Sequence, residues 1–146
     1  MTATMLEGPV SASAQDYLEA IFRITTRNRV ARSRDIAQAL GVTKSSVTTA
    51  LKQLSASGLV NYDPYSYVTL TREGEQIGRS VEARHRFLAE FLESILGVAA
   101  DRADQNACRM EHVLDDEVYK RLTEFAAYLK QNSINASTWK QEEENK

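Results

Sequence analysis

A tight turn at Gly41, between two short amphipathic segments, most constrains how this chain can fold. Apolar residues recur at helical spacing on both sides of the turn, over 33–40 and over 44–57. Gly41 suits the end of the first helix and Thr43 suits the N-cap of the second, and we expect Val42 between them to be buried. The sequence therefore predicts two helices packed closely together across a short turn.

The predicted helix over 44–57 has two contrasting faces. One face is apolar and suits a core, whereas the other is polar, slim and cationic. Two short strands, over 59–62 and 67–70, are expected to follow around a turn at 63–66. This order is that of a winged helix-turn-helix, whose second helix enters the major groove of DNA. The residues that we expect to contact bases or phosphates are Arg32, Arg34, Thr43, Lys44, Ser45, Ser46, Thr48, Thr49 and Lys52.

The charge distribution permits a DNA partner although the formal net charge is -2. Residues 23–52 carry seven basic side chains and one acidic one, whereas residues 99–146 carry seven basic and ten acidic ones. A basic N-terminal lobe would meet phosphates, which provide most of the affinity for DNA but little of the specificity. Two alternatives stay open, a helical hairpin in an ordinary core and a winged helix that contacts protein. Tyr65 and Tyr67, in the predicted wing, are expected to pack rather than to bind DNA.

Composition excludes several classes of protein. No apolar run approaches the roughly 20 residues that span a bilayer. The first 13 residues lack the charged and apolar regions of a secretory signal. One cysteine cannot form an internal disulfide, which fits a reducing compartment. We therefore expect a cytoplasmic protein of one domain or two small lobes.

The remaining pattern predicts a mostly α-helical protein. We expect an N-terminal winged helix-turn-helix domain at 1–74, with a small two-stranded wing, followed by an all-helical domain at 75–131. Residues 132–146 are polar and are expected to form a disordered tail. The other expected helices cover 13–27, 71–96, 101–114 and 116–130.

Three residues near the C-terminus suit metal binding. Cys108, Glu111 and His112 fall at i, i+3 and i+4, so a helix would present them on one face. Thiolate, carboxylate and imidazole are the side-chain ligands that divalent first-row metals prefer. Other potential ligands on other predicted helices are Asp16, Glu19 and His85.

Each candidate ligand also has an ordinary interpretation. Cys108 can be a small buried residue beside a surface Glu-His pair. Asp16 and Glu19 can be partners of a helix dipole, and His85 can be a histidine of the core. The residues alone leave these alternatives open.

Several segments within about residues 13–130 are specific in sequence and in order, among them Asp-Ile-Ala-Gln-Ala-Leu at 35–40 and Arg-His-Arg-Phe-Leu at 84–88. The most specific segment is Ala-Cys-Arg-Met-Glu-His-Val-Leu-Asp-Asp-Glu-Val at 107–118. In this order the segments resemble the diphtheria toxin repressor and manganese transport regulator family of metal-dependent repressors. The resemblance is to a short form without the SH3-like domain of the iron-responsive branch. It implies a helical metal-binding and dimerisation domain after the DNA-binding domain, and a homodimer on palindromic operator DNA.

The resemblance also implies a ligand set. Cys108 matches the iron branch, and Ala89 and Asp104 occupy two positions of that branch's ancillary site, which therefore looks degraded. A thiolate favours softer metals than Mn(II), so we expect Fe(II) first and Mn(II) next, with Co(II), Ni(II) or Zn(II) binding in vitro. The positions that match ligands of the manganese branch are Asp16, Glu19, His85, Glu111 and His112.

The expected function is that of a metal-activated transcriptional repressor of metal-homeostasis genes, not an enzyme. One rival is a winged-helix regulator that senses an organic effector. Another is a hydrolase, either with zinc and Glu111 as base or with a Cys108–His112 nucleophile pair. The sequence shows no glycine-rich oxyanion turn or phosphate loop beside the cluster, which disfavours an enzyme. The expected dimer surface consists of Phe87, Leu88, Phe91, Leu92 and Ile95.

Overall fold

The chain forms two compact units in a computed structural model that describes residues 10–144, with the side chains of residues 10–140. The units divide after Glu82, inside helix α4 (Arg72–Glu90), whereas the sequence indicated a domain boundary after Gly74. The reason is that the first half of α4 packs on the first unit. A Cβ on Gly78 would lie 2.7 Å from the main-chain oxygen of Leu18, so only glycine permits this approach.

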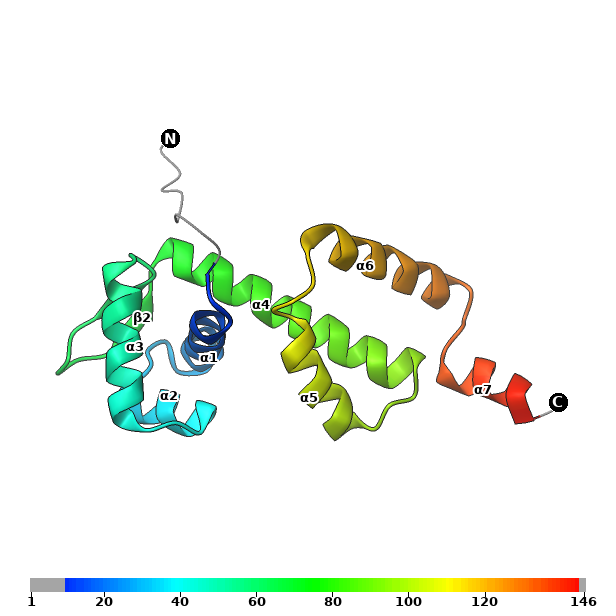
Figure 1. Cartoon of the computed structure of the whole chain (residues 1–146), viewed down its shortest axis with the longest axis horizontal. Coiled ribbons are helices and arrows are strands. Elements are labelled where there is room, and N and C mark those ends of the chain that lie inside the picture. Colours follow the sequence, from blue (N-terminus) through cyan, green and yellow to red (C-terminus); the bar gives the residue numbers. More distant parts are fainter. Residues whose placement is uncertain (1–9, 145–146) are drawn as a thin grey trace. The chain divides into compact units, whose positions relative to one another are not determined.

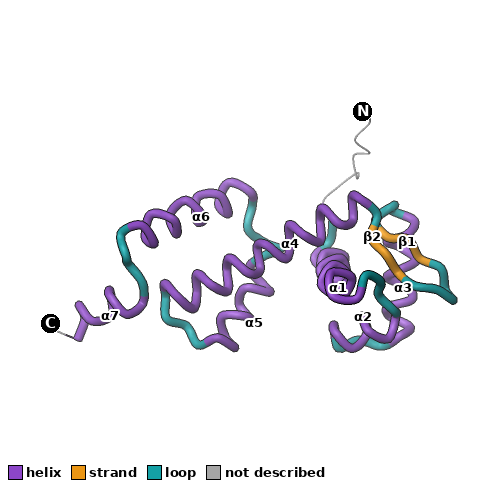
Figure 2. Tube along the Cα trace, turned by 180° about the vertical axis from the view of Figure 1, so that it is seen from behind, coloured by secondary structure: helices purple, strands orange, loops and turns teal. Residues whose placement is uncertain are grey.

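The first unit has the order of elements that the sequence predicted (Figure 1). The two strands pair antiparallel, with Val60 opposite Leu70 and Tyr62 opposite Val68 (Figure 2). An isolated bridge between Ala31 and Val68 ties the α1–α2 connection to this hairpin. The elements are α1 (Ala12–Asn28), α2 (Ser33–Leu40), α3 (Lys44–Ala56), β1 (Val60–Tyr62), β2 (Val68–Leu70) and the start of α4 (Arg72–Glu90).

One apolar core holds these elements together. Each helix contributes residues from one face, which is why the amphipathic pattern could be read from the sequence. Such a core is worth roughly 1.5–3 kcal/mol for each large side chain that it buries completely. The residues with no exposed surface include Leu18 and Ile21 of α1, Ile36 of α2, Val47 and Leu51 of α3, and Val68 of β2.

The turn at Gly41 confirms most of the local prediction. Gly41 takes a left-handed conformation with φ of 65°, and Thr43 caps α3 by accepting a hydrogen bond from the backbone N–H of Ser46. Val42, however, is 39% exposed, so its predicted burial is wrong. Its backbone N–H bonds to the oxygen of Ala37, which fixes the turn, and its side chain stays outside the core.

The helix starts differ from prediction in two places. α1 begins earlier than expected, because the hydroxyl of Ser11 accepts from the N–H of Ala14. The hydroxyl of Ser33 suits an N-cap, so the sequence predicts that Ser33 caps α2, but Ser33 lies inside the helix. Arg32 takes the N-cap position, and the carboxylate of Asp35 accepts from its backbone N–H. A carboxylate three residues into the helix therefore replaces the expected hydroxyl cap.

The second unit contains the end of α4 and four further helical elements. The long helix predicted over 71–96 changes to a π-helix at its end, where the N–H of Leu96 bonds to the oxygen of Phe91. Leu88 is fully buried, so it belongs to the core of this unit and its assignment to a dimer surface is wrong. The further elements are η1 (Phe91–Ile95), α5 (Ala100–Met110), α6 (Asp116–Gln131) and α7 (Ala136–Glu144).

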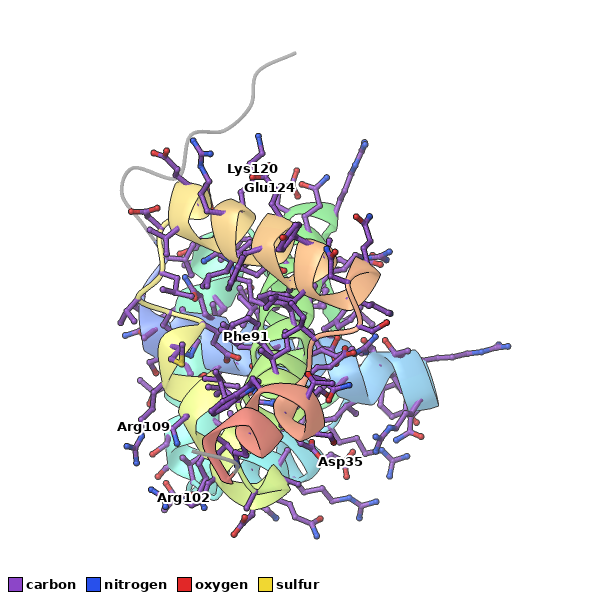
Figure 3. The ribbon with its side chains drawn as sticks, turned by 90° about the vertical axis from the view of Figure 1, so that its right-hand side faces the viewer. Asp35, Phe91, Arg102, Arg109, Lys120 and Glu124 are labelled. Carbon is purple, nitrogen blue, oxygen red and sulfur yellow. The ribbon has the colours of Figure 1, made fainter. Side chains whose placement is uncertain are left out.

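A hollow of about 550 Å³ lies between η1, α6 and the connection to α7. Phe91 lines it, and Figure 3 shows this residue on the inner side of α6, with Lys120 and Glu124 pointing away on the outer side. Lys120 and Glu124 form an exposed i, i+4 ion pair at 3.9 Å, which contributes little to stability. The inner face of α6 is thus the apolar one.

The C-terminal segment corrects another expectation. Residues 136–144 form α7 rather than a disordered tail, and residues 145–146 lie outside the described residues. The indole N–H of Trp139 donates to the main-chain oxygen of Ile95, at 2.5 Å. This bond fastens α7 to the end of η1. Across residues 10–144, no helix has the length and apolar character to cross a membrane.

Candidate metal centre and DNA-binding surface

The C-terminal end of α5 positions the central residue of the candidate metal centre. α5 stops at Met110 rather than at Leu114, so Glu111 is its C-cap and His112 lies in the following turn. The backbone N–H of Glu111 still bonds to the oxygen of Ala107. Ala107 is fully buried, so the last turn of α5 presents this side to the core of the unit. The Glu111 carboxylate is thereby directed inward.

Glu111 lies beside three other candidate ligands of the second unit. Its Oε2 is 2.8 Å from Nδ1 of His85, and its Oε1 is 3.4 Å from Nε2 of His112. The Sγ of Cys108 lies within 4.8 Å of a carboxylate oxygen of Glu111. The structure therefore brings together His85 from α4 with the three residues that the i, i+3, i+4 spacing had grouped, although they do not share one regular helix.

The burial of Glu111, His85 and His112 fits a cationic occupant. Cys108 is exposed, so its interpretation as a small buried residue is wrong. The Glu111 side chain has no exposed surface, and the side chains of His85 and His112 are each 10% exposed. A buried carboxylate is costly unless hydrogen bonds or a positive charge compensate it. Two imidazoles, a carboxylate and a thiol are also the donor types that bind divalent first-row metals. The residues of the second unit thus fit such a metal.

Asp104 is a member of the cluster that the sequence did not place there. Its Oδ1 lies 2.7 Å from Nε2 of His85, on the side of the ring opposite Glu111. The resemblance had marked Asp104 only as part of a degraded ancillary site. A signal was present, because Asp104 precedes Cys108 by four residues and so lies one helical turn away on the same face of α5.

The two acidic candidates of α1 lie in the first unit. Glu19 is buried, and its Oε1 lies 2.7 Å from Nη2 of Arg23. Arg23 also approaches Glu82, at 3.7 Å. Asp16 is half-buried. The helix-dipole interpretation is disfavoured, because the first turn of α1 contains no acidic residue and the effect of the dipole falls off within that turn.

The outward face of α3 is exposed, as a recognition helix requires. Its hydroxyl groups are already engaged locally: Thr48 donates to the oxygen of Lys44 and Thr49 to the oxygen of Ser45. Thr43 interacts with the hydroxyls of Ser45 and Ser46 at 3.1 and 2.9 Å. The lone pairs and methyl groups of the two threonines of α3 therefore remain for a partner. Lys44 and Lys52 are exposed beside them.

The wing differs from expectation. Tyr65 is fully exposed, so the prediction that it packs is wrong, whereas Tyr67 is 49% exposed and its ring contacts Arg32. The guanidinium of Arg32 lies 5.2 Å from the centre of the Tyr67 ring and donates to its hydroxyl at 3.3 Å. Arg34 pairs loosely with Asp35, at 3.8 Å. Both arginines are exposed, and Arg32 is held by the wing.

Two family descriptions match almost the whole described chain. Residues 10–68 match "Iron dependent repressor, N-terminal DNA binding domain", and residues 71–140 match "Iron dependent repressor, metal binding and dimerisation domain". An uncharacterized HTH-type transcriptional regulator of Methanocaldococcus jannaschii is 37% identical over 80% of this chain and 94% of its own length. The chain belongs to the iron-dependent repressor family. Members of this family are metal-responsive transcriptional repressors, so the predicted family, fold class and general function are confirmed.

Other relatives of the family carry manganese in their names. The HTH-type transcriptional regulator MntR of Lysinibacillus sphaericus is 33% identical over 82% of this chain and 86% of its own length. The structure of the manganese regulator SloR superposes with a TM-score of 0.70 at 29% identity, over 79% of this chain and 54% of that one. The structure of a manganese-dependent transcriptional repressor in complex with manganese superposes with a TM-score of 0.68 at 28% identity. The match covers 79% of this chain and 53% of that one. The chain thus spans about half the length of these solved structures.

Proposed function

We propose that the protein is a cytoplasmic repressor that binds palindromic operator DNA as a homodimer when it is loaded with Fe(II) or Mn(II). The observation that carries this proposal is the fully buried carboxylate of Glu111, placed 2.8 Å from His85 and beside Cys108 and His112. A carboxylate so enclosed by donor atoms suits a divalent cation better than it suits solvent.

The ligand set proposed for the metal consists of the six candidate residues that the sequence indicated. When bound, the metal supplies positive charge that compensates the carboxylates and the thiolate. Glu19 would exchange its ion pair with Arg23 for this charge. The proposed ligands are Asp16 and Glu19 of α1, His85 of α4, Cys108 and Glu111 of α5 and its cap, and His112 of the following turn.

A constraint on α1 reaches the recognition helix through the core of the first unit. Leu18 of α1, Ile36 of α2 and Val47 of α3 are fully buried in one cluster, so α1 cannot shift without moving its neighbours. Ligation by residues of α1 would therefore favour one arrangement of α3. This is how a metal ligand can change affinity for DNA, by binding one conformational state better than another.

The surface of α3 would contact the operator. Lys44 and Lys52 would meet phosphates, as would Arg32 and Arg34, and Thr49 would approach base edges. Two recognition helices are needed because one reads few base pairs, and a two-fold protein matches a two-fold operator. The family description of residues 71–140 as a dimerisation domain supports the homodimer. The further proposed contacts are Thr43, Ser45, Ser46 and Thr48.

Iron and manganese are both supported. The thiolate of Cys108 suits Fe(II), Co(II), Ni(II) and Zn(II) better than Mn(II), whereas Asp16 and Glu19 suit Fe(II) and Mn(II). Fe(II) suits both kinds of donor, and we place it first. The manganese regulators among the relatives support Mn(II) as second.

A DNA-binding titration tests the proposal. Duplexes selected from a random pool with the Mn(II)-loaded protein would be labelled, and their affinity measured by anisotropy with metal, without metal and with a chelator. We expect the metal to tighten binding by about 5–150-fold, and the chelator to reverse this. Equal affinity in all three conditions would overturn the metal switch. Analytical ultracentrifugation of the same complexes tests two chains per duplex.

A further inference from the structure

His85 is held between two carboxylates, one at each ring nitrogen. Nδ1 lies 2.8 Å from Oε2 of Glu111, and Nε2 lies 2.7 Å from Oδ1 of Asp104. A neutral imidazole has one N–H donor and one nitrogen lone pair, whereas an ionised carboxylate only accepts. When the ring is neutral, the two contacts therefore compete for its single proton.

The positions of the other donors decide which nitrogen suits the metal. Cys108 and His112 lie beside Glu111, which is on the Nδ1 side of His85. A metal bound by this cluster needs the lone pair of Nδ1, so the ring proton must be on Nε2. Asp104 is the acceptor at Nε2. Its side chain is 69% exposed, so it stays solvated and does not need a metal to compensate burial.

A second metal at Nε2 has weaker support. It would be bound by His85 and Asp104, but position 89, one helical turn from His85, is an alanine without a donor atom. Two protein ligands fall short of the four that tightly bound structural metals usually have. The geometry at Nε2 suits a hydrogen bond better than a second metal.

We propose that Asp104 is a positioning residue, which accepts the Nε2–H of His85 and so keeps Nδ1 unprotonated and oriented toward the metal. This inference rests on the proposed metal function and assigns a role to a residue outside its ligand set. Carboxylates that accept from metal-binding histidines fix the tautomer and raise the basicity of the other nitrogen. Removal of such a partner typically weakens metal binding about 10–100-fold.

The first measurement uses the metal-free protein. Nitrogen chemical shifts of His85, recorded by NMR above neutral pH, report which ring nitrogen carries the proton. We expect the Nε2–H form in the wild type. In Asp104→Ala the acceptor at Nε2 is lost while Glu111 remains at Nδ1, so the proton should move to Nδ1. The same tautomer in both proteins would overturn the proposal.

The second measurement is the dissociation constant for Mn(II) and Co(II), by calorimetry. We expect Asp104→Ala to bind about 10–100-fold more weakly and Asp104→Asn to fall in between, because an amide oxygen accepts less strongly. The control is Asp101→Asn, which removes one charge from the exposed first turn of the same helix. Its dissociation constants should stay within about twofold of the wild-type values.

The outcomes separate this inference from the proposed function. A wild type that binds no divalent metal contradicts the proposed function itself. A wild type that binds metal, with Asp104 variants of equal affinity, contradicts only the positioning role. Loss of one bound metal per chain in Asp104→Ala, with the affinity of the remaining metal unchanged, would show that Asp104 is a ligand and would also overturn the proposal.

Discussion

The guanidinium of Arg84 donates a hydrogen bond to the main-chain oxygen of Leu114, at 2.6 Å. The same group pairs with Asp116 and lies 4.7 Å from the centre of the Tyr119 ring. Arg84 thereby fastens the connection between α5 and α6 to α4. This connection begins with Glu111 and His112, so Arg84 restricts where two proposed metal ligands can lie.

Replacement of Arg84 by Ala should destabilise the second unit and loosen this connection. A charged hydrogen bond from a side chain that is 13% exposed is worth about 1.5–3 kcal/mol, and we expect a loss of that size in chemical denaturation. The control is Asp116→Asn. The Asp116 side chain is 99% exposed, so its loss should cost under about 1 kcal/mol. Equal losses in both variants would contradict the role given to the Leu114 carbonyl.

Cys108 should set the metal preference. Its thiolate would be the soft ligand in a set of nitrogen and oxygen donors, and such ligands bind deprotonated. We expect Co(II) in the wild type to show a sulfur-to-metal charge-transfer absorption that disappears in Cys108→Ser. Cys108→Glu should shift activation from Fe(II) or Co(II) toward Mn(II). An identical Co(II) spectrum in wild type and Cys108→Ser would mean that the thiol is not a ligand, and manganese would then become the first choice.

The lysines of α3 should affect all duplexes alike. Lys44→Ala and Lys52→Ala each remove one proposed phosphate contact. The slope of log affinity against log salt is negative, and its magnitude should fall by about 0.9 in each variant. Binding measured at several salt concentrations, on selected and on random duplexes, checks this. An unchanged slope in both variants would show that neither lysine contacts the DNA backbone.

Thr49 should affect sequence preference instead. Its hydroxyl proton is used within α3, so the methyl group and the oxygen lone pairs face the partner. Thr49→Val keeps a methyl group and removes the oxygen. Thr49→Ser keeps the hydroxyl oxygen and removes the methyl group. A contact with a thymine methyl predicts that Thr49→Ser changes the selected sequence more. Selection experiments with both variants distinguish the two contacts, and unchanged sequences in both would exclude base contact by Thr49.

Gly74 should tolerate no side chain. A Cβ there would lie 1.9 Å from the main-chain oxygen of Leu59, so Gly74→Ala must displace α4 from the wing. We expect a loss of about 1–3 kcal/mol in the free energy of unfolding. The neighbouring Glu73 is exposed, and Glu73→Ala should change stability by less than about 0.5 kcal/mol. Similar melting curves for the two variants would contradict the tight packing.

The sequence predicted the first unit well because its signals are local. Helix periodicity, the glycine at 41 and the cap at Thr43 each depend on a few neighbouring residues, and all three are present in the structure. Val42 was assigned wrongly because burial depends on which side of the turn faces the core. The packing predicted for Tyr65 was wrong because a general tendency of tyrosines in hairpins to pack does not determine where one side chain of a particular loop points.

The candidate metal centre was predictable in its residue types but not in its contacts. The spacing of Cys108, Glu111 and His112 indicated a cluster, although α5 ends before two of them. Asp104 was not placed beside His85, because the contact joins residues 19 positions apart on different helices. Such a contact depends on how α4 and α5 pack, which helical periodicity does not specify.

The π-helix at Phe91–Ile95 has a consequence for insertions and deletions. A π-turn holds one more residue than an α-turn between bonded groups, as the bond from the N–H of Leu96 to the oxygen of Phe91 illustrates. Removal of Ser94 would let this stretch close as an ordinary α-turn, and Gly97 would keep its place at the helix end. One deleted residue would thus be absorbed here, whereas a deletion in the middle of α4 would rotate every later side chain by about 100° around the helix axis.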